Sequence, residues 1–112
     1  MARTSIPDPL SRRHLLEGKL DAGKAAAIGR AYLEAGREVE AVDFLARGEA
    51  TDELKTLQTA AIERGDVFLL RVASGGLGVD PSPGDWERLG AAASAAGRVR
   101  DAESAARLAT VR

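Results

Sequence analysis

Two segments of this chain share a frame in which two glycines lie seven residues apart and an arginine follows the second. Each copy also has an alanine five residues after its second glycine, so the full set is Gly29, Gly36, Arg37 and Ala41, then Gly90, Gly97, Arg98 and Ala102. An internal repeat of helical character predicts stacked helical hairpins, in which each unit buries its apolar face against its neighbours. Such a scaffold implies an interaction surface without naming the partner.

Residue types that favour the start or the end of a helix recur along the chain. Asp or Ser stands at N-cap positions, Pro follows at the first helical position twice, and Gly stands after most of the expected helices. The expected helices cover residues 9–17, 22–35, 37–47, 51–64, 67–74, 83–96 and 98 to near the end. Apolar residues recur at three and four positions rather than two, so no strand is expected. Residues 75–81, which contain Gly75, Gly76 and Gly78, are the one long segment expected to be irregular.

The sequence therefore predicts an all-α fold with a short leading helix and three antiparallel hairpins that turn at Gly36, Gly65 and Gly97. We expect one helical-repeat domain, 1–112, divided into 1–20, 21–48, 49–78 and 82–112. Gly29 and Gly90 lie inside helices, where glycine is unfavourable, so we expect a close approach of the following helix there. Ala41 and Ala102 are predicted to supply the small facing surface, and Trp86, Leu89, Tyr32 and Phe44 are predicted to pack in the core.

The third hairpin resembles the tetratricopeptide repeat, because Trp86, Leu89 and Gly90 match its W-x2-L-G opening and are followed by Gly97, Ala102 and Ala109. The first hairpin matches in part through Ile28, Gly29, Tyr32, Gly36 and Ala41, and the middle hairpin through Leu54, Leu57, Ala61 and Gly65. The resemblance implies that the hairpins stack as a right-handed superhelix. The turn glycines are 29 and 32 residues apart (65 − 36 and 97 − 65) rather than about 34, which leaves another alpha-alpha superhelix open.

In tetratricopeptide-like proteins the first helices line a groove that binds a peptide or a helix of another protein. By matched position, this resemblance implies that the groove face carries Arg30, Glu34, Lys55, Thr59, Glu63, Glu87 and Ser94. We therefore expect a non-enzymatic protein-interaction module that needs no cofactor. The alternative is a homo-oligomer that assembles through the terminal helix, where Val99, Ala102, Ala106 and Ala109 lie at helical spacing.

Composition argues against other classes of protein. Hydrophobic residues make up 45% and charged residues 29%, which is the balance of a globular chain, and no apolar run is long enough for a membrane span. A cytoplasmic location is the default expectation. Residues 21–85 carry seven Lys and Arg against twelve Asp and Glu. With a sequence pI of about 5.8, the chain lacks the basic character of a nucleic-acid binder.

Catalytic and metal chemistry has little support in the sequence. There is no Cys, and His14 is the single His, which we expect at the surface near a helix end. Gly75 and Gly76 lack the Lys that a phosphate-binding loop requires. The acidic residues Glu38, Glu40 and Asp43 are expected to be solvated, and the serines are expected to cap helices or face water. A small enzyme or nucleic-acid binder is thus the least favoured hypothesis.

Overall fold

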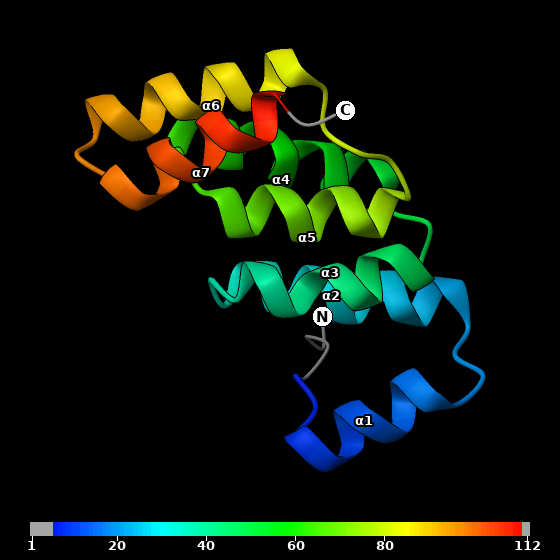
Figure 1. Cartoon of the computed structure of the whole chain (residues 1–112). Coiled ribbons are helices and arrows are strands. Elements are labelled where there is room, and N and C mark those ends of the chain that lie inside the picture. Colours follow the sequence, from blue (N-terminus) through cyan, green and yellow to red (C-terminus); the bar gives the residue numbers. More distant parts are fainter. Residues whose placement is uncertain (1–5, 111–112) are drawn as a thin grey trace. The chain divides into compact units, whose positions relative to one another are not determined.

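The computed structural model describes residues 6–110, which form helices and no strands (Figure 1). In chain order the helices are α1 (Pro9–Glu17), α2 (Ala22–Glu34), α3 (Glu38–Arg47), α4 (Thr51–Arg64), α5 (Val67–Leu77), α6 (Pro83–Ala95) and α7 (Val99–Thr110). The all-α class is confirmed. Contacts divide the chain into two compact units, Met1–Leu54 and Lys55–Arg112, with the boundary inside α4. That the chain forms one domain therefore stays a prediction.

Apart from the end of α5, the predicted helix ends agree with the structure to within one residue, because they are encoded by neighbouring residues. The Asp8, Asp21 and Asp66 carboxylates accept hydrogen bonds from backbone N–H groups of the first turns of α1, α2 and α5. Ser82 and Asp85 form a reciprocal capping box at the start of α6, with both hydrogen bonds 3.0 Å long. The turn glycines Gly36, Gly65 and Gly97 all adopt a left-handed conformation, with φ between 70° and 75°.

In the unit Met1–Leu54, α2 and α3 form a hairpin around an aromatic pair. Tyr32 and Phe44 are fully buried and their rings stack with centroids 5.6 Å apart. The close approach predicted at Gly29 is present, and the atoms nearest to a Cβ there belong to Leu45. A Cβ on Gly29 would lie 2.7 Å from Leu45 Cδ2 and 3.1 Å from the Leu45 backbone nitrogen. Gly29 thus lets the hairpin close over a large side chain.

Helix α1 is held on this hairpin by polar contacts, since none of its residues is buried. The Arg12 guanidinium donates to the Glu40 carbonyl oxygen at 3.0 Å and to an Asp43 carboxylate oxygen at 3.1 Å. At the other end of α1, Arg47 donates to the Leu16 carbonyl and, at 2.8 Å, to the Gly18 carbonyl. These bonds satisfy carbonyls that the helix end would otherwise leave unpaired.

In the unit Lys55–Arg112, one cluster of buried side chains joins the helices. Its members come from α4 to α7 and are Ala61, Val67, Leu69, Leu70, Trp86, Leu89, Ala93 and Ala105. A Cβ on Gly65 would lie 2.4 Å from Ala93 Cα, so the turn after α4 contacts the backbone of α6 directly. Gly90 is different, because a Cβ there would meet Ala105 Cβ at an ordinary 3.4 Å. The close approach expected at Gly90 is therefore looser than the one at Gly29.

One helix is longer than predicted. Helix α5 continues through Gly75 and Gly76 to Leu77, so the irregular segment covers 78–82 instead of 75–81. Gly78 adopts a left-handed conformation, and the backbone N–H groups of Gly78 and Val79 donate to the Gly75 and Ser74 carbonyls at 3.1 Å. This hydrogen-bonded end offsets the low helix propensity of the two glycines.

Candidate protein-interaction surface

Three of the predicted groove residues lie together on one face of α4. Lys55, Thr59 and Glu63 are four residues apart in turn, which places them in a row along the helix. All three are exposed, whereas Leu57 and Ala61 on the opposite side are buried. The row lines a shallow hollow of about 330 Å³, together with Thr56 and Ala60. We call these five residues the α4 face.

The chemistry of the α4 face is bipolar. Lys55 places an ammonium group at one end and Glu63 places a carboxylate at the other, with the Thr59 hydroxyl between them. Thr59 Oγ1 donates to the Lys55 carbonyl at 3.2 Å, which leaves the oxygen free to accept a hydrogen bond. The small Ala60 side chain permits close approach of a partner. This arrangement can bind a segment whose charges run in the opposite order.

The other predicted groove residues do not line this hollow. Glu87 and Ser94 are exposed and lie seven residues apart, which puts them on one face of α6. Arg30 and Glu34 are exposed on α2 and belong to the unit Met1–Leu54. The structure therefore brings together three of the seven predicted residues on a single surface.

Arg30 has a structural partner that sequence reasoning did not find. Its guanidinium contacts the Glu53 carboxylate at 2.8–2.9 Å, which links α2 to the first turn of α4. The hydrogen bond from Arg30 holds the pKa of Glu53 below its ordinary value. Arg30 thus stabilises the unit Met1–Leu54.

Two of the acidic residues after Gly36, Glu40 and Asp43, form ion pairs. Asp43 pairs with Arg12, and Glu40 pairs with Arg37 through both carboxylate oxygens. The hydrogen bonds from Arg37 lower the pKa of Glu40. Arg12 and Arg37 also lie over the Tyr32 ring, with guanidinium carbons 5.7 and 5.1 Å from its centroid. The Asp43 side chain is 62% exposed and the Glu40 side chain 40% exposed, so both carboxylates reach water, as expected, while they pair with these cations.

A second hollow, of about 590 Å³, lies beside the segment 78–82. Trp86 and Leu108 contribute apolar walls, and Arg71 and Asp80 contribute charge. Ser74 also lines it but is buried, and its hydroxyl accepts a hydrogen bond from Gln58 Nε2 at 3.0 Å. The prediction that Ser74 caps a helix or faces water was therefore wrong.

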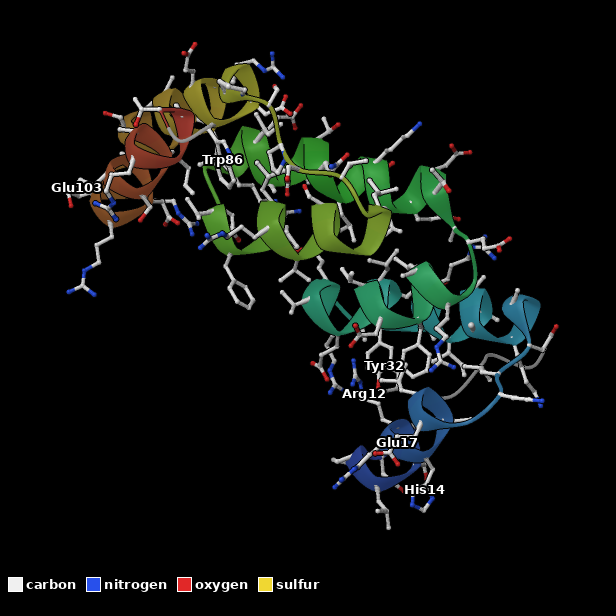
Figure 2. The ribbon with its side chains drawn as sticks, turned by 45° about the vertical axis from the view of Figure 1, so that its right-hand side comes forward. Arg12, His14, Glu17, Tyr32, Trp86 and Glu103 are labelled. Carbon is white, nitrogen blue, oxygen red and sulfur yellow. The ribbon has the colours of Figure 1, made fainter. Side chains whose placement is uncertain are left out.

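His14 lies where the sequence predicts, exposed in the last turn of α1 (Figure 2). Within residues 6–110, no group of three His, Asp or Glu side chains is placed to hold a metal ion. Over the same residues, no helix has the length and apolar character needed to cross a bilayer. Comparisons with models of protein families, with curated proteins and with solved structures find no match to this chain.

Proposed function

We propose that this chain is a non-enzymatic, cytoplasmic protein-interaction module that binds a peptide or a helix of a protein partner on the α4 face. In this proposal the hairpins stack as a tetratricopeptide-like superhelix, and the first helices α2, α4 and α6 share the binding surface. The proposal needs no cofactor and no nucleic acid. Its main support is the hollow on α4, because three residues chosen by matched position line it together.

Residues Lys55 and Glu63 offer a test that preserves net charge. We expect the double variant Lys55→Glu with Glu63→Lys to lose a protein recovered by affinity purification and mass spectrometry from the native cells, because each partner charge would meet a like charge. The matched control is Arg100→Glu with Glu103→Lys, a swap of two exposed charges on α7. Equal recovery by both variants would contradict the proposal, provided that circular dichroism and melting are unchanged.

Self-assembly through α7 is the second candidate, and the exposure of its apolar residues bears on it. Val99 is 63% exposed and Ala106 is exposed, whereas Ala102 and Ala109 pack partly against the core. Two small exposed side chains offer little apolar area for a stable dimer. Light scattering of wild type and Val99→Glu decides between self-assembly and the interaction module. A dimer that the substitution dissociates would favour self-assembly, and a monomer in both would favour the interaction module.

A further inference from the structure

The guanidinium of Arg12 lies in a site formed by two aromatic rings and an acidic helix. Its central carbon lies 5.7 Å from the centroid of the Tyr32 ring and 5.4 Å from that of the Phe44 ring. Its Nη2 donates to the Glu40 carbonyl oxygen at 3.0 Å and to an Asp43 carboxylate oxygen at 3.1 Å. Figure 2 shows Arg12 of α1 beside Tyr32 of α2. We call Tyr32, Glu40, Asp43 and Phe44, which all lie on the α2–α3 hairpin, the arginine site.

The chemistry of the arginine site favours a guanidinium over an ammonium group. The Tyr32 and Phe44 rings offer π faces, and the Glu40 carbonyl and the Asp43 carboxylate offer hydrogen-bond acceptors. A planar guanidinium stacks on aromatic rings and donates several hydrogen bonds in a fixed fork, whereas an ammonium group is a compact and strongly hydrated charge. The arginine site therefore selects arginine over lysine.

Arg12 belongs to a helix that is weakly attached to the hairpin. No residue of α1 is buried, and Leu10 is 65% exposed. The Asp43 side chain is 62% exposed, so its ion pair with Arg12 lies at the surface, where such pairs contribute little to stability. Once detached, a helix of nine residues is marginal in water. Little apolar burial therefore opposes the release of α1.

The attachment of α1 also buries a hydrogen-bond donor that has no partner. Arg12 Nε is buried and has no acceptor among the described residues. A donor buried in this way loses its hydrogen bond to water and regains it when the side chain returns to solvent. Arg47 offsets part of this cost, because it donates to the Leu16 carbonyl and, at 2.8 Å, to the Gly18 carbonyl. The net attachment is weak enough for a competing helix to replace α1.

From these observations we propose that the arginine site binds an arginine on a basic helix of a protein partner, and that α1 occupies the site until the partner displaces it. The resident helix shows the chemistry of the occupant. Arg13 pairs with Glu17 along α1, which leaves Arg12 to contact the acidic hairpin. The inference adds a second contact, which α1 blocks, to the α4 face. It rests on the proposed function only in taking the ligand to be a protein.

The test uses the full chain, labelled with ¹⁵N, and two basic helical peptides as probes. The arginine peptide is acetyl-Ala-Ala-Lys-Ala-Ala-Ala-Arg-Ala-Ala-Ala-Lys-Ala-Ala-amide, and the lysine peptide has lysine in place of its arginine. We expect saturable NMR shifts of the Asp43 and Phe44 backbone amides with the arginine peptide. The lysine peptide should bind about fivefold more weakly or less, because it loses stacking and a hydrogen bond. Absence of saturable shifts, or equal affinity for the two peptides, would overturn the proposal.

Variants at Arg12 test whether α1 blocks the site. Arg12→Ala removes the resident guanidinium, and it leaves the core of the hairpin intact because no residue of α1 is buried. We expect the arginine peptide to bind Arg12→Ala about fivefold or more tightly than wild type, since affinity is reduced by the fraction of molecules in which α1 occupies the site. Arg12→Gln is a second variant with the same expectation. Affinity no higher than that of wild type in both variants would contradict displacement of α1.

Two charge reversals, each made in the Arg12→Ala chain, locate the bound peptide. Asp43→Lys should weaken binding about fivefold or more, because it removes an acceptor and adds a like charge. Glu103→Lys makes the same charge change on α7 and should leave the affinity unchanged. Equal affinities in the two would overturn the assignment to the arginine site.

The outcome is separable from that for the α4 face. The Lys55→Glu, Glu63→Lys double variant should bind the arginine peptide as wild type does, so failure of either proposal leaves the other standing. Loss of binding in this double variant would contradict the assignment to the arginine site. A wild-type dimer that Arg12→Ala dissociates in light scattering would give the site to a second copy of this chain and overturn its assignment to a partner.

Discussion

Gly65 and Gly97 share a backbone conformation but have different surroundings, so the same substitution at both isolates the effect of packing. Both are left-handed, with φ of 70° and 74°. A Cβ on Gly65 would lie 2.4 Å from Ala93 Cα and 2.5 Å from the Ala93 nitrogen, whereas a Cβ on Gly97 would meet nothing within 4 Å. Both glycines belong to the unit Lys55–Arg112. Gly97→Ala is thus the control for Gly65→Ala.

The expected losses follow from two physical costs. A left-handed residue other than glycine costs about 1–2 kcal/mol, so Gly97→Ala should destabilise by about 1 kcal/mol. At Gly65 the methyl group also collides with backbone atoms that cannot rotate away, and overpacking of this kind adds about 1–3 kcal/mol. Gly65→Ala should therefore destabilise by about 2–4 kcal/mol.

Trp86 provides the assay, because it is the single Trp and lies 5% exposed in the core of the same unit. Urea unfolding followed by Trp86 fluorescence reports the free energy of unfolding of that unit, with far-UV circular dichroism as a check on helix content. We expect a midpoint much lower for Gly65→Ala than for Gly97→Ala. Equal losses would refute the direct contact between the turn after α4 and the backbone of α6.

Three further predictions use other contacts. Gly90→Ala should raise the melting temperature slightly, because the new Cβ meets Ala105 of α7 at an ordinary 3.4 Å and helix propensity improves by about 1 kcal/mol. Gly90→Leu should lower the melting temperature by overpacking against α7. A melting temperature that falls for Gly90→Ala and rises for Gly90→Leu would contradict the packing at α7. Arg30→Gln should destabilise above the unfolded-state pKa of Glu53, about 4.3, and the difference from wild type should vanish as pH falls through the lowered folded-state pKa. Urea titrations of wild type and Arg30→Gln at pH 7 and pH 3 measure this difference in the free energy of unfolding. An equal difference at both pH values would refute the pairing of Arg30 with Glu53. Arg47→Ala should free the end of α1 and speed tryptic cleavage at Lys19, and an unchanged rate would contradict its role.

Helix ends could be predicted from the sequence because their causes lie within a few residues. The Ser82 and Asp85 capping box and the left-handed Gly36 are set by neighbouring side chains and by the lack of a Cβ. The sequence predicts that α5 ends before Gly75, because glycine has a low helix propensity, whereas the helix continues to Leu77. Its continuation depends on the hydrogen bonds formed at Gly78.

The polar contacts between different helices could not be predicted because they join residues distant in the chain. Arg12 contacts Glu40 and Asp43 from 28 and 31 positions away, and Arg30 contacts Glu53 from 23 positions away. Periodicity shows which face of a helix is polar, but not which polar residue of another helix it meets. Lys55, Thr59 and Glu63 could be grouped from the sequence because they lie four residues apart on one helix.

Photo-crosslinking from the α4 face tests the proposed function most directly. A benzophenone amino acid in place of Thr59 lies in the centre of the hollow, and the same group in place of Glu103, exposed on α7, is the control (Figure 2). After irradiation in the native cells, we expect a discrete adduct with another protein from position 59 and none from position 103. Absence of an adduct from position 59, or an adduct between two copies of this chain from position 103, would contradict the account.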